Sequence, residues 1–381
     1  MKKIPTLEDA GDLKGKRVLL RLDLNAPVAD GKVTETYRLD KSLPILDDLH
    51  LKGAKVIIIA HIETKDNPTL LPVWEYMHGF LPIKFSPTYF TKEADTMVSN
   101  LEDGEVMMFE NVRMNPGEKS NDMEFAKKLA AYGDIYVNDA FAVSHREQAS
   151  IVLVPTLLPH YAGPLFMDEV NNLSKAFNPP HPFLFVLGGA KFETKLPLIQ
   201  KFLKSADTIF VGGALANDVF KAKGYEIGTS LVSQGDFGIE KLLQEPNFKY
   251  PIDVTVSASI AEASATEVTF KDADQVSKDE YIGDVGPKTI EMLREAANNS
   301  KFILWNGPLG NFEIGFNDKT EQLAELIANS GAETIVGGGD TLASIQKLNL
   351  LEKFSFVSTA GGAMLDFLAN ETLPGIEALT N

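Results

Sequence analysis

Short apolar runs alternate with longer stretches of helical spacing along almost the whole chain, and this alternation restricts the fold more than any other feature. Such runs are typical of buried strands, and helices between them connect parallel strands. We therefore predict an α/β protein in which parallel sheets are flanked by helices. The strands expected in the first half are 17–22, 55–60, 106–109 and 134–138, with helices at 38–52 and 121–132. In the second half they are 183–187, 207–211, 252–256, 301–305, 333–336 and 354–358.

The length of the chain favours two domains. Its 381 residues exceed what a single hydrophobic core usually supports. A segment with three prolines and a glycine, 151–164, separates the two alternating halves, and the helical pattern that follows ends at Asn178-Pro179-Pro180. We expect an N-terminal domain over 1–164, a connecting helix over 165–178 and a second domain of similar size from residue 179 onward.

Charge and composition limit the partners of this protein. It has 53 acidic and 36 basic residues and a net charge of −17, which argues against nonspecific binding to nucleic acid or to anionic membranes. The absence of cysteine excludes disulfides, thiolate metal sites and cysteine nucleophiles. The N-terminal residues lack the apolar core of a signal peptide, and no apolar run approaches the roughly 18 residues needed to span a bilayer. We expect a cytoplasmic protein that binds neither nucleic acid nor membrane.

Polar and basic side chains follow the predicted strands of the first half. In an open parallel sheet, ligands bind outside the carboxyl ends of the strands, so these side chains are expected to line one crevice. They are Asp23 and Asn25, then His61, then Glu110, Asn111 and Arg113, then Asn138 and Asp139 followed by Ser144, His145 and Arg146.

Four arginines lie at or near these strand ends in a chain that is otherwise acidic: Arg21, Arg38, Arg113 and Arg146. A single arginine most often forms a surface ion pair. Several on one crevice would instead bind a small phosphorylated or carboxylated molecule, because guanidinium groups bind such anions in bidentate fashion. A lone histidine such as His61 is more often a structural residue than a general base.

Glycine-rich turns follow the predicted strands of the second half. They are Gly188-Gly189-Ala190, Gly212-Gly213-Ala214, Asn306-Gly307-Pro308, the segment 337–341 and the segment 360–363. Together these turns would surround a polyphosphate with backbone N–H donors. Lys191 and Lys195 are four residues apart and would share one helix face beside the first turn. The alternative is a tight turn followed by two solvated lysines.

Two acids in the second half are candidate ligand residues. Asp340 is suited to Mg²⁺, which usually binds one or two carboxylates together with substrate phosphates. Its alternative role is a helix N-cap that accepts a hydrogen bond from Leu342 or Ala343. Glu313 would accept from ribose hydroxyls or would be a solvated loop acid.

Motifs of several enzyme classes are absent. The chain has no G-x-x-x-x-G-K-[ST] or G-x-G-x-x-G sequence, which removes support from P-loop enzymes and from dehydrogenases. It also lacks H-E-x-x-H and G-x-S-x-G.

From the residues at their strand ends, the two halves are interpreted as an anion site and a nucleotide site that face each other. Phosphoryl transfer between them depends on positioning and charge stabilisation, and a carboxylate acceptor requires no general base.

A series of motifs resembles the phosphoglycerate kinase family in the family's own order. They are RLDLNAPV at 21–28, FENVRMNPGE at 109–118, YVNDAFAVSHR at 136–146, GGAKFETK at 188–195, DVGPKT at 284–289, WNGPLGNFE at 305–313, VGGGDT at 336–341 and STAGGAMLD at 358–366. The resemblance implies two α/β domains joined by a helix and hinge. The second domain would span 179–365, and the segment 366–381 would return to the first. We also expect a monomer.

The resemblance further implies an activity. It is the reversible transfer of a phosphoryl group from 1,3-bisphosphoglycerate to Mg-ADP, which gives 3-phosphoglycerate and ATP in glycolysis. Mg²⁺ would be the cofactor, with ADP or ATP as the nucleotide. Because the two substrates would bind to different domains, the domains must approach each other and exclude water before transfer.

The family's site residues can be assigned here where the motifs match. The implied phosphoglycerate site consists of Asp23, Leu24, Asn25, Arg38, His61, Ile62, Glu63, Thr64, Arg113 and Arg146. The implied nucleotide site consists of Gly189, Lys195, Gly213, Asn306, Glu313, Gly338, Gly339, Asp340 and Thr341, with Asp340 also binding the metal. The residues that would stabilise the phosphoryl group in transfer are Arg38, Lys191, Gly361 and Gly362.

Three departures from the family pattern bear on activity. After the second strand the family usually has His-Leu-Gly-Arg-Pro, but this chain has HIETK at 61–65. An arginine that contacts substrate is therefore missing. If nothing replaces it, the binding free energy of the substrate is weaker by about 1.5–3 kcal/mol. Lys65 is the candidate replacement. Gln148 stands in place of a second histidine, and Ala360 in place of the first of three glycines, where a positive φ would strain an alanine. An active kinase is the leading hypothesis, and a nucleotide-binding protein with weakened or altered kinase activity is the alternative.

Overall fold

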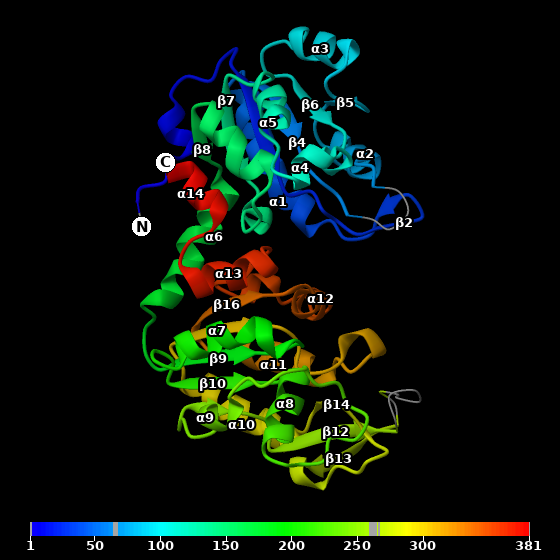
Figure 1. Ribbon diagram of the computed structural model, residues 1–381, viewed down its shortest axis with the longest axis vertical. Coiled ribbons are helices and arrows are strands. Elements are labelled where there is room, and N and C mark those ends of the chain that lie inside the picture. Colours follow the sequence, from blue (N-terminus) through cyan, green and yellow to red (C-terminus); the bar gives the residue numbers. More distant parts are fainter. Residues whose placement is uncertain (1, 64–67, 259–264, 266, 381) are drawn as a thin grey trace. The chain divides into compact units, whose positions relative to one another are not determined.

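The computed structural model describes residues 2–63, 68–258, 265 and 267–380, and the chain divides into two compact units (Figure 1). Unit 1 comprises Met1–Asn171 and Asn370–Asn381, and unit 2 comprises Asn172–Ala369. Each unit is built on a six-stranded parallel sheet whose strands alternate with helices along the chain, as predicted. None of the helices in the described ranges is both long and apolar enough to cross a membrane.

The sheet of unit 1 has the strand order β5-β6-β4-β1-β7-β8. Its strands are β1 (Arg17–Leu22), β4 (Lys55–Ile59), β5 (Ile83–Ser86), β6 (Val106–Phe109), β7 (Ile135–Asp139) and β8 (His160–Ala162). The helices are α1 (Tyr37–Leu51), α2 (Leu71–His78), α3 (Lys92–Ser99), α4 (Pro116–Lys119), α5 (Met123–Ala130) and α14 (Pro374–Thr380). A short antiparallel pair, β2 (Val28–Ala29) and β3 (Lys32–Val33), precedes α1. Helix α6 (Pro164–Ser174) leads from unit 1 into unit 2.

Strand β1 lies inside this sheet and is buried on both faces, one of them lined by Val18, Leu20 and Leu22. Every residue from Val18 to Leu22 is fully buried, as expected for a parallel strand covered by helices on both sides. It pairs with β4 on one side and with β7 on the other, where Leu22 lies opposite Asp139. The strand order reverses between β1 and β7, so the residues that follow these two strands meet at a topological switch point.

The C-terminal segment packs within unit 1. The backbone N–H of Gly375, next to the start of α14, donates to the carbonyl oxygen of Ser144 at 2.8 Å. A side chain at Gly375 would collide with Ser144, because a Cβ atom there would lie 2.6 Å from that residue's Cβ. The two ends of the chain therefore both belong to unit 1 (Figure 1).

The sheet of unit 2 has the strand order β11-β10-β9-β15-β16-β17. Its strands are β9 (Phe183–Leu187), β10 (Thr208–Val211), β11 (Phe248–Lys249), β15 (Phe302–Asn306), β16 (Glu333–Gly337) and β17 (Phe356–Ser358). The helices are α7 (Phe192–Phe202), α8 (Ala214–Ala222), α9 (Ile239–Leu242), α10 (Pro287–Asn299), α11 (Asp318–Ala328), α12 (Gly339–Lys347) and α13 (Gly362–Asn370). The order reverses between β9 and β15, where Leu187 lies opposite Asn306.

Unit 2 also contains a second sheet that the sequence analysis did not anticipate. Strand β12 (Asp253–Ser257) was expected among the parallel strands, but it lies between β13 (Thr269–Asp272) and β14 (Tyr281–Val285) in an antiparallel sheet. Strand β13 is mostly exposed, as an antiparallel strand with one solvated face can be. Its polar sequence therefore carries no apolar run that would have identified it.

Three short strands at or near the sheet edges were also missed: β5, β8 and β11. They are two to four residues long and include polar residues such as Lys84 and His160. Edge strands are hydrogen-bonded on one side only, so they need neither length nor a continuous apolar sequence. The predicted central strands agree with the structure to within one or two residues at each end.

A buried acid at the end of β7, which accepts a hydrogen bond from the first turn of α6, makes the stability of unit 1 pH-dependent. Asp139 Oδ1 accepts from the backbone N–H of Phe166 at 2.9 Å, whereas its Oδ2 has no partner among the described residues. Burial raises the pKa of this carboxyl from 3.8 to about 7, so the folded state holds the proton more tightly than the unfolded state does. The stabilisation is complete below about pH 4 and is lost as the pH rises through 7.

We therefore expect the free energy of unfolding to fall between pH 5 and pH 8, and Asp139→Asn to remove roughly 2–3 kcal/mol of that decrease. Denaturant unfolding of both proteins at the two pH values measures the difference. Asp134→Asn is the control, because Arg17 lowers the pKa of that exposed carboxyl and its titration falls below the range. Equal pH slopes for the wild type and Asp139→Asn would contradict the assignment.

Candidate active site

A cluster of arginines and acids lies at the switch point of unit 1. Arg38, in the first turn of α1, donates to Asp23 Oδ2 at 2.5 Å, and Asp23 follows β1 directly. Asn25 is two residues further along, and its Oδ1 accepts from the backbone N–H of Glu63 at 2.8 Å. The loop after β1 is thereby tied to the loop after β4. The prediction that strand-end residues of the first half converge is confirmed for this group.

Arg113 and Arg146 join the same cluster through Glu63. Both guanidinium groups donate to Glu63 Oε1, Arg146 at 3.3 Å and Arg113 at shorter range. The other terminal nitrogen of Arg113 donates to Gln148 Oε1 at 3.1 Å. Burial and the nearby arginines lower the pKa of Arg113 to about 10, with Glu63 acting in the opposite direction, so Arg113 remains cationic at neutral pH.

His61 lies beneath this cluster and is neutral. Its side chain is buried, and its Nδ1 lies 3.3 Å from Nη2 of Arg21. Burial and the positive charge of the surrounding arginines hold the pKa of His61 far below its usual range. His61 can therefore serve as a hydrogen-bonding group but not as a cationic one.

A buried hydrogen-bond network holds His61 in place, and the sequence analysis did not identify it. Arg21 was a candidate for the anion crevice, but the structure buries it completely and directs its Nε to Ser150 Oγ at 3.0 Å. Ser150 in turn donates from its hydroxyl and its backbone N–H to the carboxylate of Glu118, at 2.6 and 2.9 Å. Glu118 lies within one of the recognised motifs, but nothing local distinguishes it from a solvated acid.

The remaining predicted residues of this site contribute in other ways. Leu24 and Ile62 bury their side chains in the hydrophobic core of unit 1, so only their main-chain groups could reach a ligand. Asn111 was expected at the crevice, but it is buried and donates to the carbonyl oxygens of Ile62 and Pro68, so it positions the loop after β4. Thr64 and Lys65 lie outside the described residues.

In unit 2, the glycine turns come together at the switch point between β9 and β15. The N–H of Gly188 donates to the carbonyl oxygen of Asn306 at 2.8 Å, and that of Gly189 donates to Pro308 at 3.0 Å. A Cβ atom at Gly188 would lie 2.1 Å from the Pro308 oxygen, so this approach of two turns requires glycine. The predicted convergence of the turns after β9 and β15 is confirmed.

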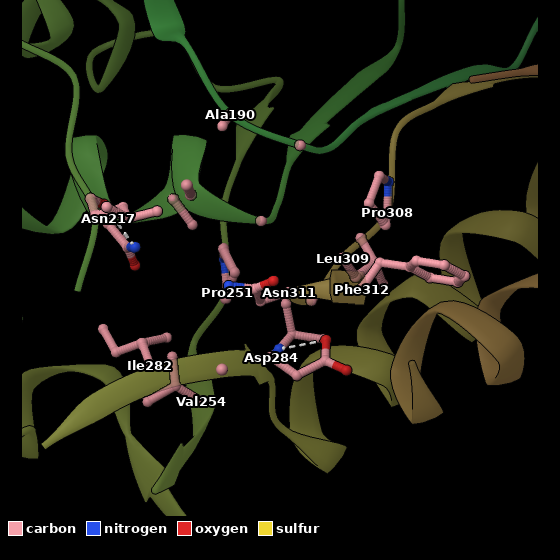
Figure 2. A pocket seen from close by; sticks show the side chains of 18 of the residues that line it. Ala190, Asn217, Pro251, Val254, Ile282, Asp284, Pro308, Leu309, Asn311 and Phe312 are labelled. Carbon is pink, nitrogen blue, oxygen red and sulfur yellow. Dashed lines mark hydrogen bonds between the residues drawn. The ribbon is translucent and has the colours of Figure 1, made fainter. Parts of the chain in front are cut away.

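These turns border a cavity of about 220 Å³ (Figure 2). Four of the predicted nucleotide-site residues line it: Gly189, Gly213, Glu313 and Asp340. Ala190, Ala214 and Pro308, from the predicted glycine turns, also line it, whereas the part of the wall from α8 and the antiparallel sheet was not predicted. Figure 2 shows Ala190 after β9, Asn217 on α8, Leu309 and Phe312 after β15, and Val254, Ile282 and Asp284 from the antiparallel sheet. Strand β12 was predicted, but its pairing with β13 and β14 was not, which is why this side of the cavity was missed.

Lys195 and Asn306 lie next to each other, outside the lining of the cavity. Lys195 Nζ is 3.4 Å from Asn306 Oδ1, and burial lowers the pKa of this lysine to about 8 although Asp366 opposes the shift. Gly338, in the turn after β16, approaches the same region, since a Cβ atom there would lie 3.3 Å from the nitrogen of Gly307. A partly desolvated lysine gains most when a phosphate supplies the opposite charge.

Lys191 does not share a helix face with Lys195, so that prediction was wrong. Helix α7 begins at Phe192, and Lys191 precedes it in the left-handed conformation, with φ of +66°. Its side chain is exposed, and its ammonium group has no hydrogen bond or ion pair among the described residues. A left-handed lysine costs about 1–2 kcal/mol relative to glycine. Backbone strain of this kind occurs often at functional sites, and Lys191 follows Ala190, which lines the cavity.

Asp340 occupies the first turn of α12, and it is not the helix N-cap. That position belongs to Gly338, and the N–H of Leu342 donates to the Gly338 carbonyl, so the capping alternative is wrong. The Asp340 carboxylate makes no hydrogen bond or ion pair with described residues, and desolvation together with the charge of Glu313 raises its pKa. This carboxylate lines the same cavity as Gly189, Gly213 and Glu313.

Two further predicted residues lie apart from the cavity. Thr341 is completely buried, and its hydroxyl has no partner among the described residues. Gly339 is exposed at the start of α12.

Gly361 and Gly362 form the start of α13, where Gly361 has φ of +54°. The left-handed conformation falls on Gly361 and not on Ala360. The strain considered for Ala360 is therefore absent.

One α/β unit with a cluster of arginines and a second with a glycine-lined cavity, nearby lysines and an acid without a partner among the described residues are features of a two-domain phosphotransferase. A model of the family described as phosphoglycerate kinase matches residues 7–371. The chain belongs to the phosphoglycerate kinase family, and the resemblance drawn from its motifs is confirmed.

Individual relatives match over nearly their full length. A phosphoglycerate kinase of Dictyoglomus turgidum is 40% identical over 383 residues, covering 97% of this chain and 96% of that protein. One of Haemophilus influenzae is 41% identical over 381 residues with the same coverage.

Two solved structures share the fold. Phosphoglycerate kinase from Coxiella burnetii matches with a TM-score of 0.84 and 37% identity, covering 99% of both chains. Phosphoglycerate kinase from Pyrococcus horikoshii matches with a TM-score of 0.85 and 32% identity, covering 99% of this chain and 98% of that one.

Proposed function

We propose that this protein catalyses the reaction of its family in glycolysis. A phosphoryl group passes reversibly from 1,3-bisphosphoglycerate to ADP, which gives 3-phosphoglycerate and ATP. The observation that carries this proposal is the pairing of two complementary sites in one chain. Unit 1 offers cationic groups for a small anion, and unit 2 offers a cavity among glycine turns for a nucleotide.

In unit 1, Arg113 and Arg146 would bind the phosphate or carboxylate of phosphoglycerate, with Asp23 and Asn25 accepting from its hydroxyl. Arg146 is 40% exposed and accessible to a ligand. His61 would contribute a neutral hydrogen bond, since its low pKa keeps it uncharged. The acceptor is a carboxylate that is already ionised, so this arrangement needs no proton acceptor.

In unit 2, the nucleotide would occupy the cavity bordered by Gly189 and Gly213, with Glu313 accepting from the ribose. Lys195 would bind phosphate oxygens next to Asn306. Asp340 would hold the Mg²⁺, which when bound neutralises charge on the phosphates. The phosphates of the nucleotide would supply further oxygen ligands to this metal.

Three features would stabilise the group in transfer. Lys191 and Arg38 supply positive charge from the two units, and the N-terminus of α13 at Gly361 and Gly362 supplies backbone donors. Such donors act mainly on charge that develops in the transition state.

A coupled assay with 3-phosphoglycerate and Mg-ATP tests the proposed activity. We expect turnover that depends on both substrates. Binding of ATP without turnover would instead support a nucleotide-binding protein with weakened or altered kinase activity. That alternative is motivated by Glu63, whose carboxylate lies among the arginines of unit 1.

We also propose that the two units close during the reaction. The proposed substrate sites belong to different compact units, and reacting atoms must come within about 3–3.5 Å of each other for transfer. The radius of gyration from small-angle scattering is therefore expected to fall when 3-phosphoglycerate and Mg-ADP, which cannot react together, are both bound. Either ligand alone should have less effect. An unchanged radius with both bound would contradict closure.

The proposed enzyme is a cytoplasmic monomer. Its domains would be 1–164 and 179–365, joined by the helix 165–178, with 366–381 returning to the first domain. Sedimentation at working concentrations tests the monomeric state.

A further inference from the structure

Glu63 places a carboxylate where the phosphoglycerate site would bind an anion. Its Oε1 accepts from terminal nitrogens of both Arg113 and Arg146. No other described acid forms an ion pair with either arginine. An arginine pair that converges on one oxygen is the arrangement that a substrate phosphate or carboxylate would require.

The position of Glu63 is defined by the loops that carry the site. Its backbone N–H donates to Asn25 Oδ1 at 2.8 Å, which attaches it to the loop after β1. The second terminal nitrogen of Arg113 donates to Gln148 Oε1 at 3.1 Å. Both terminal nitrogens of Arg113 therefore already have acceptors from this chain.

The partners differ greatly in exposure, which determines which of them can move. The side chain of Arg113 is 3% exposed, whereas that of Glu63 is 46% exposed. The buried arginine is held by its surroundings, while the glutamate can rotate into solvent at little cost. An incoming anion would displace Glu63 and leave Arg113 in place.

We propose that the Glu63 carboxylate occupies the anion position of the acceptor-substrate site and that substrate must displace it to bind. Glu63 thereby sets both the affinity and the selectivity of this site for anions. The inference rests on the proposed phosphoglycerate site. Two anions cannot share the same donors without repulsion, so each substrate anion must replace the bonds to Glu63. A molecule with both a phosphate and a carboxylate makes more contacts than inorganic phosphate does, so it displaces Glu63 more readily.

Glu63→Gln tests the inference, because glutamine keeps the size and the acceptor oxygen but removes the charge. We expect the KM for 3-phosphoglycerate to fall about 3- to 10-fold, the effect of removing one partly exposed repulsive charge. The KM for ATP should be unchanged. Inhibition by inorganic phosphate, competitive with 3-phosphoglycerate, should become stronger by a similar factor.

Glu124→Gln is the matched control. Glu124 is an exposed glutamate of unit 1 that pairs with Lys127, so its substitution changes the net charge equally without touching the site. Its KM values should equal those of the wild type. A fall in the KM for 3-phosphoglycerate in this control equal to that in Glu63→Gln would overturn the inference, because the effect would then be one of net charge.

Arg146→Gln separates failure of this inference from failure of the site itself. We expect this variant to raise the KM for 3-phosphoglycerate and to reduce the effect of adding Glu63→Gln. If Arg146→Gln raises the KM but Glu63→Gln leaves it unchanged or raises it, the inference is wrong and the site stands. If Arg146→Gln has no effect on the KM, both are wrong.

Calorimetric titration of 3-phosphoglycerate provides a readout independent of turnover. The dissociation constant should fall in Glu63→Gln by the same factor as the KM. Should that variant not fold, Glu63→Asp serves instead, because a side chain one methylene shorter keeps the charge but reaches the arginines less well. Binding of 3-phosphoglycerate to Glu63→Asp with unchanged or weaker affinity would overturn the inference.

Discussion

Replacing Lys191 with alanine is expected to lower kcat by about 10²- to 10³-fold, the loss typical when a donor directed at transition-state charge is removed. The ammonium group of Lys191 has no partner among the described residues, so it is available to a ligand. A group that acts on the phosphoryl group in transfer contributes more to the transition state than to substrate binding. Steady-state kinetics should therefore show a large change in kcat with little change in either KM.

The unusual backbone at Lys191 supplies a matched control. With φ of +66°, alanine retains the strain of the left-handed conformation, whereas glycine does not. Lys191→Gly should lose as much activity as Lys191→Ala, yet it should unfold at an equal or higher denaturant concentration than Lys191→Ala. Near-normal turnover in either variant would exclude the proposed role. If both variants lose activity and both also unfold at a lower denaturant concentration than the wild type, Lys191 has a structural role instead.

Replacing Asp340 with asparagine is expected to reduce kcat/KM for Mg-ATP by about 100-fold, the scale of a lost charge-stabilising group at a phosphate site. Asparagine keeps the shape of the side chain and removes its charge. The carboxylate has no ion pair with described residues, so its loss should leave the fold intact. The variant should require more Mg²⁺ for half-maximal activity than the wild type.

Thermal unfolding with ADP, in the presence and absence of Mg²⁺, tests Asp340 without relying on turnover. The wild type should be stabilised further by the metal, and Asp340→Asn should not. Glu313→Gln is the comparison, because Glu313 lines the same cavity but is proposed to bind ribose. Glu313→Gln should weaken nucleotide binding equally with and without the metal. A normal metal effect in Asp340→Asn would contradict its assignment as the ligand.

The central strands and the chemical nature of their ends could be predicted from sequence alone. Strand β9 is apolar on both faces and strand β1 is apolar apart from its two arginines, and in both strands the buried residues are consecutive in the chain. The glycines after β9 and the polar residues after β1 are equally local features. Parallel sheets place such ends at one edge, which is why the two candidate sites could be assigned before the structure was known.

The details of each site could not be predicted in this way. Lys191 was expected on a helix face, but the turn places it just before α7 in a left-handed conformation. Asp340 was a candidate N-cap, but the backbone assigns that position to Gly338. Differences of one or two residues at a helix end change what a side chain can contact, and local pattern does not resolve them.

The sequence by itself determined which residue types stand at the strand ends, and with them the candidate anion and nucleotide sites. Only the tertiary structure decided their partners. Arg113 meets Glu63 across 50 residues, and Arg21 meets Ser150 across 129. Such contacts depend on which strands are neighbours in the sheet, and periodicity along the chain carries no information about that order. The placement of Glu63 among the arginines, and the burial of Arg21 behind His61, follow from the strand order β4-β1-β7.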